Sequence, residues 1–243
     1  MIDLHCHILP GVDDGAIDFD EAVAMCRLAA ARGCEEMVAT PHQRHPRWWN
    51  DDRARLERVV RELQSRVGPS PRLHLGAEIR LCSGLLEEVE ALPGGSLLPL
   101  AGSRYLLLEL DSAGLGPDPF EIVHEVSVAG WQPIIAHPEL YPWLVGEPGL
   151  AERLVELGAR LQVTGMSLTG GFGRRAQAAC RELIDGGLVA FVASDAHGLV
   201  TRPPGLAQAY TLLAASWGEE VAQALTRSNA AAVIANRPLP LAA

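Results

Sequence analysis

Aromatic residues make up only 5% of this 243-residue sequence, whereas hydrophobic residues as a whole make up 48%. We therefore expect a sizeable core that is filled by aliphatic side chains and alanine. No apolar run reaches the roughly 18 residues that a membrane-spanning helix requires, so membrane insertion is not expected. The length suits one large domain, and we expect residues 1–243 to form it.

Basic residues are too few to dominate the surface, because 30 Asp and Glu residues outnumber 20 Lys and Arg residues and the net charge is −10. A general nucleic-acid binder, or a protein that binds acidic membranes, would present a basic face, so neither kind of partner is expected. An anionic substrate is still compatible with this charge if local cations attract it. Bound metal ions could supply those cations.

The five cysteines are odd in number and scattered, and the sequence has no C-x-x-C motif. The first residues lack the basic segment and the long apolar segment of a signal peptide. Both observations indicate a protein of the reducing cytoplasm with free thiols. A cysteine-phosphatase mechanism is not expected, because the segment from Cys26 to Arg32 has the required spacing but no glycine and a helical character. A G-x-S-x-G motif and a Walker loop are also missing.

Short apolar segments alternate with segments of helical period along the whole sequence. Strands buried on both faces give nearly continuous apolar runs, and we expect them at Ile2–His5, Glu36–Thr40, Leu73–Ile79, Tyr105–Leu110, Gln132–Ala136, Arg160–Thr164 and Leu188–Ala193. Helices are expected over 18–32, 50–67, 118–129, 147–157, 174–185 and 206–215. Asp18 or Asp20 is the expected N-cap of the first helix, and Asn50 or Asp51 that of the second.

Strand–helix units in series predict parallel strands joined by helical crossovers. The favoured architecture is a closed or nearly closed α/β barrel of seven strands. A doubly wound open sheet is the alternative, because periodicity does not distinguish the two.

Histidine and acidic residues follow six of the seven expected strands. The carboxyl ends of parallel barrel strands form the rim where active sites are built, so these side chains are expected to converge. One such residue alone is usually structural, but coincidence is a poor explanation for six strand ends together. Imidazole and carboxylate ligands suit first-row divalent ions such as Mn, Fe or Zn. Two or three ions, some bridged by a carboxylate, would use all nine candidates: His5, His7, Asp14, His42, Glu78, Glu109, His137, Asp195 and His197.

Eight segments carry a family resemblance, and they lie at residues 2–15, 39–42, 76–79, 107–110, 135–139, 163–173, 193–197 and 202–204. Together they resemble the PHP-type (polymerase and histidinol phosphatase) tyrosine-protein phosphatases of bacterial capsule and exopolysaccharide clusters. The likeness includes the Val-Asp-Asp-Gly element at 12–15 and is specific to this subfamily. The resemblance implies the PHP fold, which is a distorted, TIM-barrel-like (β/α)7 barrel. It also implies a trinuclear centre, usually described with Mn, at the nine candidate ligands.

The same resemblance implies a substrate, namely phosphotyrosines in the tail of a polysaccharide-copolymerase autokinase. Arg202 matches a phosphate-binding arginine, and we expect it to act in catalysis together with Asp14, His42 and His197. The sequence departs from the family at Leu140, where an arginine usually follows Pro-Glu. Such a guanidinium would hold phosphate by two parallel hydrogen bonds.

Substrate contacts could come instead from the loop after His42. Arg44 and Arg47 could compensate for the missing guanidinium, and Trp48 could form an aromatic wall for a tyrosyl ring. Packing of these side chains against the barrel rim is the competing interpretation.

The expected reaction is direct hydrolysis by a metal-activated hydroxide, without a phosphoenzyme. A phenolate leaving group, whose conjugate acid has a pKa near about 10, needs little protonation, so a weak general acid suffices. Asp13 is one candidate for that acid. Two alternatives stay open: a phosphatase of a small phosphomonoester such as histidinol phosphate or a sugar phosphate, and a metal-stabilised scaffold without catalysis.

Overall fold

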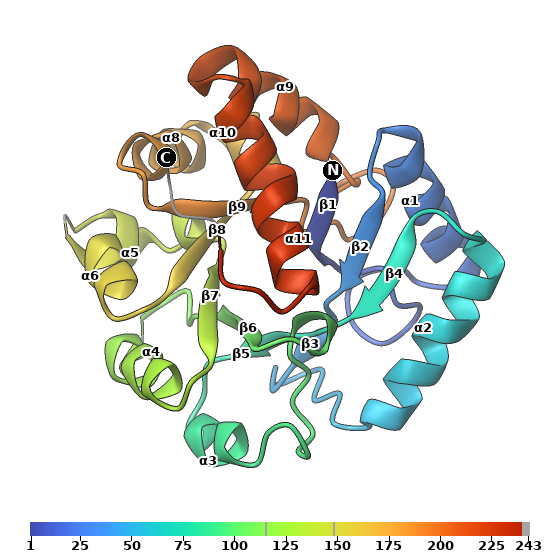
Figure 1. Cartoon of the computed structure of the whole chain (residues 1–243), viewed down its shortest axis with the longest axis horizontal. Helices are drawn as coiled ribbons and strands as arrows, with labels where there is room; N and C mark the ends of the chain where they lie inside the picture. The colour runs from blue at the N-terminus through green and yellow to red at the C-terminus, as the bar shows by residue number, and fades with distance from the viewer. Residues whose placement is uncertain (115, 148, 240–243) are drawn as a thin grey trace.

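The computed structural model describes residues 1–114, 116–147 and 149–239 (Figure 1). These residues form nine strands, all of them paired in parallel: β1 (Ile2–Cys6), β2 (Glu36–Ala39), β3 (His42–Gln43), β4 (Arg72–Leu75), β5 (Glu78–Arg80), β6 (Tyr105–Glu109), β7 (Gln132–Ala136), β8 (Arg160–Thr164) and β9 (Val189–Ala193). One sheet has the order β1-β2-β4 and the other β3-β5-β6-β7-β8-β9. The expected α/β class with parallel strands is confirmed.

The expected strand Leu73–Ile79 is divided into β4 and β5, and a short strand that was not expected, β3, follows the expected strand Glu36–Thr40. β2 ends before Pro41, which has no N–H to donate to a ladder. The segment from Arg72 breaks at Gly76, where a Cβ would lie only 2.8 Å from Leu100 Cδ2. The ladder continues across both breaks, because Gly76 N–H donates to Ala39 O at 2.9 Å and Glu78 N–H donates to Pro41 O at 3.2 Å. β3 therefore continues β2 along the same ladder, and β5 continues β4.

The last strand lies beside the first. Just beyond β9, Asp195 N–H donates to His5 O and His7 N–H donates to Ala196 O, both at 2.8 Å. A buried side chain supports the same contact, since Asp3 Oδ1 accepts from Ser194 N–H at 2.9 Å. These bonds bring the first candidate ligands, His5 and His7, next to the last ones, Asp195 and His197.

The helices are α1 (Phe19–Ala31), α2 (Arg53–Val67), α3 (Leu85–Glu90), α4 (Pro119–Val128), α5 (Pro142–Val145), α6 (Leu150–Glu156), α7 (Gly165–Leu168), α8 (Arg174–Asp185), α9 (Leu206–Trp217), α10 (Glu219–Gln223) and α11 (Asn229–Ile234). Short 3-10 helices cover Leu100–Gly102 and Pro138–Leu140, and a π-helix covers Ala224–Ser228. In the expected helix over 147–157, position 148 lies outside the described residues. No helix in the described part of the chain is both long and apolar enough to cross a bilayer.

Helix starts confirm one expected cap and correct another. Asp18 caps α1 by accepting from Glu21 N–H at 2.9 Å. The cap of α2 is Asp52, and the expectation of Asn50 or Asp51 was wrong. Asn50 has another task, because its amide donates to the carbonyls of Val12 at 3.1 Å and His42 at 2.9 Å. It thereby ties the loop before α2 to the loop after β1.

The core has two parts. The larger part lies between the strands and the surrounding helices, and the smaller part gathers Ile2, Leu4, Tyr105, Leu107 and other residues with Ala230 and Val233 of α11. Figure 1 shows α11 lying over the middle of the strands, where it contacts β1 and β9. This packing fixes the strands from which the candidate ligands project.

Candidate metal centre

All nine predicted ligands lie together at the carboxyl ends of the strands. They form four overlapping groups, and in each group the ligand atoms lie within 4.8 Å of one another. The groups are His7, Asp14, His42 and His197; His5, His137 and Asp195; His5, His7 and Glu78; and His42, Glu78 and Glu109. β1, β3, β5 and β6 or the loops behind β1, β7 and β9 supply every member.

Glu78 is the centre of the cluster. Its Oε1 lies 2.8 Å from His137 Nε2, and its Oε2 lies 3.0 Å from His42 Nδ1, 3.3 Å from His7 Nε2 and 3.4 Å from His5 Nε2. Burial of this carboxylate would raise its pKa, but the surrounding imidazoles, with that of His5 contributing most, hold the pKa well below its usual value. One ionised carboxylate therefore contacts four imidazoles.

His5 and His7 direct their Nε2 atoms at each other across only 3.2 Å. The opposite ring nitrogen of each is already engaged, since His5 Nδ1 lies 2.7 Å from Gln162 Oε1 and His7 Nδ1 lies 2.8 Å from Asp13 Oδ2. In the neutral tautomers that serve these two acceptors, both Nε2 atoms present a lone pair, so a proton or a metal ion must lie between them. A cation resolves this conflict, so the residues present fit a metal ion.

Other buried atoms support the same fit. Asp195 Oδ1 is buried and accepts no hydrogen bond, although His5 Nε2 lies 3.3 Å away. His197 donates through Nδ1 to the backbone carbonyl of Asp195 at 2.9 Å, which leaves its Nε2 facing Asp14 Oδ1 at 3.4 Å. Such nitrogen and carboxylate donors suit first-row divalent ions.

Without a cation, the imidazoles of the cluster hold protons tightly. Burial would lower the pKa of His42, but Asp14 and Glu78 outweigh burial and raise it to about 11. The pKa of His7 is raised to about 9 against its burial, chiefly by Asp13, and that of His137 to about 9 by Glu78. A metal ion must therefore displace protons from these rings.

Asp14 marks the open side of the site. Its Oδ1 lies 3.4 Å from the Nε2 atoms of both His42 and His197, and its side chain is 42% exposed, whereas that of Glu78 is 1% exposed. Substrate and water can reach the cluster from this side.

Arg202 lies against the cluster, as the sequence predicts. Its guanidinium pairs with the Asp195 carboxylate and lies 5.6 Å from the centroid of the Phe172 ring. Its backbone carbonyl accepts from His197 N–H at 2.9 Å. The positively charged guanidinium of Arg202, on the loop that follows β9, thus lies beside the candidate ligands.

The expected substrate residues differ in their placement. Trp48 stacks on the His42 ring with centroids 5.4 Å apart, and the Arg47 guanidinium lies 4.5 Å from the Trp48 centroid. Arg44 pairs with Glu88 of α3 and lies 4.5 Å from the centroid of the Trp49 ring. Trp48 and Arg47 therefore border the cluster, and Arg44 is committed to the neighbouring helix.

Sequence reasoning missed three contacts to candidate ligands. Asp13 contacts the ring of the candidate ligand His7. His7 lowers the pKa of the Asp13 carboxyl in spite of burial, and a carboxyl with a lowered pKa does not suit the role of general acid. Gln162 holds His5 from β8. Arg80 lies 3.4 Å from Glu109 and 2.6 Å from Asp111. The available signals were a polar residue in the buried strand β8 and the period of two that places Arg80 on the side of Glu78.

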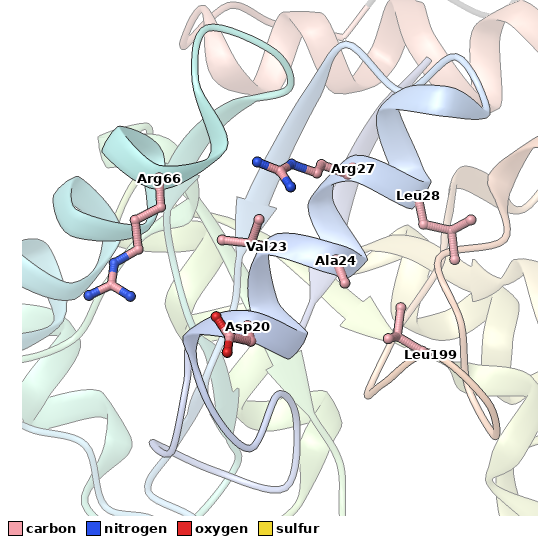
Figure 2. A pocket seen from close by; sticks show the side chains of 7 residues that line it. All are labelled: Asp20, Val23, Ala24, Arg27, Leu28, Arg66 and Leu199. Carbon is pink, nitrogen blue, oxygen red and sulfur yellow. The ribbon is translucent and has the colours of Figure 1, made fainter.

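An open groove of about 880 Å³ runs over α1 outside the cluster (Figure 2). Val23, Ala24 and Leu28 line it with Arg27 from the same helix, Arg66 reaches it from α2, and Leu199 reaches it from the loop after β9. Leu199 is two residues beyond His197, so the groove adjoins the loop that also carries Arg202.

Exposed large apolar side chains gather on the loops around the site. Ile17, Trp49, Leu199 and Val200 are exposed on the loops that follow β1, β3 and β9. Val128, at the far end of α4, is the other exposed large apolar residue in the described part of the chain. The loops after β1 and β9, which carry candidate ligands, therefore also expose large apolar side chains.

Comparisons with known proteins agree with this geometry. A family model described as capsular polysaccharide synthesis, CpsB/CapC, matches residues 1–235. Tyrosine-protein phosphatase YwqE of Bacillus subtilis is 34% identical over 98% of this chain and 93% of that protein. The putative tyrosine-protein phosphatase CapC of Staphylococcus aureus is 34% identical over 86% of this chain and 82% of that protein.

Solved structures are also similar. A structure from work on YwqE from B. subtilis and CpsB from Streptococcus pneumoniae, described as unique metal-dependent tyrosine phosphatases, matches with a TM-score of 0.91 and 33% identity over 99% of this chain and 96% of that one. A dihydropyrimidinase from Brevibacillus agri matches at 12% identity with a TM-score of 0.55, over 98% of this chain and 71% of that one. The second likeness concerns the fold alone.

Proposed function

Because this chain belongs to the capsular polysaccharide synthesis family CpsB/CapC, we propose that it is a metal-dependent protein-tyrosine phosphatase. The observation that carries the proposal is the convergence of nine imidazole and carboxylate side chains around Glu78. The substrate class is a phosphotyrosyl protein, and we assign the tail of a polysaccharide-copolymerase autokinase as the target.

The proposed metal ligands are His5, His7, Asp14, His42, Glu78, Glu109, His137, Asp195 and His197. They would hold two or three divalent ions, with Mn as our first assignment and Fe or Zn as alternatives. When bound, such ions supply Lewis-acid stabilisation of the phosphoryl oxygens and activate water at neutral pH, so that no phosphoenzyme is needed. The paired Nε2 atoms of His5 and His7 support this assignment.

The remaining roles fall to side chains beside the cluster. Arg202 would offset negative charge on the phosphoryl group, since its guanidinium lies against Asp195. Trp48 would pack against the tyrosyl ring, and Arg47, which lies on Trp48, would add a second cation. Asp14, His42 and His197 would hold the reacting water on the open side of the site. Arg44 could contribute only by leaving Glu88.

We further propose one domain over residues 1–243, folded as a distorted (β/α)7 barrel of the PHP type. The ladder that continues from β2 to β3 and from β4 to β5, and the backbone bonds between β1 and the end of β9, support closure. We propose a cytoplasmic location on the cysteine usage of the sequence.

The exposed apolar loops favour a polypeptide over a small phosphomonoester. With Mn present, kcat/KM on a phosphotyrosyl peptide is expected to exceed that on histidinol phosphate by at least about 10²-fold, because the small substrate leaves the apolar surface unused. Steady-state assays with both substrates and with a generic aryl phosphate check this. A preference for histidinol phosphate would favour the small-substrate function, and hydrolysis of none of the three would favour the scaffold.

The loop after β9 is expected to contact the polypeptide beside the phosphotyrosine. Val200→Asp should raise KM for a phosphotyrosyl protein about fivefold, which corresponds to ~1 kcal/mol of lost contact, and leave turnover of a small aryl phosphate unchanged. Val128→Asp is the matched control, because Val128 is also exposed but lies at the end of α4 that precedes β7. An equal change in both variants, or no change in either, would contradict the role of this loop.

A further inference from the structure

Three side chains contact candidate ligands but belong to none of the four ligand groups. They are Asp13, Gln162 and Arg80. Each approaches a different part of the cluster. Gly15 N–H holds Asp13 and Asp111 holds Arg80, whereas Gln162 Nε2 is buried without a hydrogen-bond partner among the described residues. The inference below rests on the proposed metal centre.

Asp13 joins two ligands of one group. Its Oδ2 accepts from His7 Nδ1 at 2.8 Å and from the backbone N–H of His42 at 3.1 Å. Its Oδ1 accepts from Gly15 N–H at 3.0 Å, which fixes the carboxylate in the turn after β1. The side chain is fully buried, so water does not compete for these contacts. Asp13 therefore sets both the orientation of His7 and the position of the strand that carries His42.

Gln162 serves a different group. Its Oε1 lies 2.7 Å from His5 Nδ1, and the side chain is 1% exposed. His5 in turn belongs with His137 and Asp195. A neutral amide holds the ring without adding charge, which makes Gln162 a positioning residue and not a ligand.

Arg80 serves the carboxylate side of the cluster. Its Nη1 lies 3.4 Å from Glu109 Oε2, and its Nη2 lies 2.6 Å from Asp111 Oδ2. Glu109 belongs with His42 and Glu78. Asp111 thus anchors the guanidinium, and the guanidinium limits where Glu109 can turn.

We propose that Asp13, Gln162 and Arg80 are positioning residues for three of the four overlapping ligand groups, each of which would hold one cation. Asp13 supports the position at His7, Asp14, His42 and His197; Gln162 supports that at His5, His137 and Asp195; and Arg80 supports that at His42, Glu78 and Glu109. Groups that orient ligands from the second layer typically change metal affinity by about 10–100-fold when they are removed. The three positions share only His42, so each removal is expected to act mainly on one position.

The test is a Mn²⁺ titration of the full chain with metal analysis of the bound fraction. Asp13→Asn, Gln162→Met and Arg80→Met should each weaken one class of site by about 10–100-fold and leave the others near the wild-type value. At a free Mn²⁺ concentration between those constants, each variant should hold about one ion fewer than the wild type. The double variant Asp13→Asn/Gln162→Met should hold about two fewer.

Glu36→Gln provides a matched control, because Glu36 Oε2 lies 2.7 Å from His74 Nε2 in a similar pair outside the cluster. It should leave the Mn²⁺ content unchanged. If Gln162→Met does not fold, Gln162→Glu keeps the acceptor and should retain the site that methionine removes. The inference is overturned if the variants weaken every site equally, if they change none, or if the wild type holds fewer than three ions. A wild type that binds no ion at all would instead overturn the proposed function.

Discussion

Glu78→Gln is expected to lower kcat/KM on a phosphotyrosyl peptide by about 10³-fold. Glu78 contacts the imidazoles of His5, His7, His42 and His137, and these four histidines together represent all four ligand groups. A glutamine keeps the shape but removes the charge that holds a divalent ion. Loss of the Lewis-acid contribution, which amounts to several kcal/mol, gives a rate effect of this size, because each ~1.4 kcal/mol is about tenfold.

Metal analysis separates this effect from misfolding. The variant should hold fewer Mn²⁺ ions than the wild type while its circular dichroism spectrum in the presence of a chelator matches that of chelator-treated wild type. A Glu78→Gln protein with full Mn²⁺ content and full activity would show that the cluster is not the catalytic centre.

The apparent affinity for Mn²⁺ is expected to rise steeply with pH. In the metal-free protein the pKa values of His7 and His137 are about 9 and that of His42 is about 11, so all three rings carry protons at pH 7. Binding must release those protons, and each one released makes the apparent association constant rise about tenfold per pH unit. Titrations between pH 6 and pH 8, repeated in buffers of different ionisation enthalpy, measure both the slope and the protons released.

Stability of the metal-free protein should follow the opposite trend. A histidine whose folded-state pKa is raised contributes stability that is fully present below its unfolded pKa of about 6.5 and is lost as the pH rises through the folded pKa. For His7 and His137 that loss falls between pH ~6.5 and ~9. Thermal unfolding with a chelator should therefore give a falling Tm over this range. If neither the metal affinity nor the Tm of the metal-free protein changes with pH, the inferred protonation of His7, His42 and His137 is wrong.

The sequence predicts strands well where burial on both faces leaves an apolar run. β7 and β8 match their expected bounds, Gln132–Ala136 and Arg160–Thr164. The short strand β3 and the break at Gly76 escaped prediction. The break depends on the close approach of Leu100 from a distant segment. The cap of α2 escaped for a similar reason, since Asn50 binds two carbonyls that only the folded chain brings near it.

The candidate site divides in the same way. The convergence of the nine expected ligands could be predicted because each lies near the end of an expected strand or in the loop after it, and parallel strands bring their carboxyl ends to one rim. The roles of Asp13, Gln162 and Arg80 were not identifiable, because their partners are set by tertiary structure. Gln162, for example, contacts a histidine 157 positions away in the sequence. A candidate ligand can be recognised from its residue type, whereas a supporting residue can be recognised only once its neighbour in the folded chain is known.

The hydrogen bonds between β1 and the segment beyond β9 also bear on synthesis of the protein. Asp195 N–H meets His5 O, so the earliest and the latest parts of the pocket form its two walls. The ribosome must synthesise the chain beyond Asp195 before these two parts can form their hydrogen bonds, and domains generally fold as units. A nascent or truncated copy that lacks the segment beyond β9 is therefore expected to be inert toward phosphotyrosine.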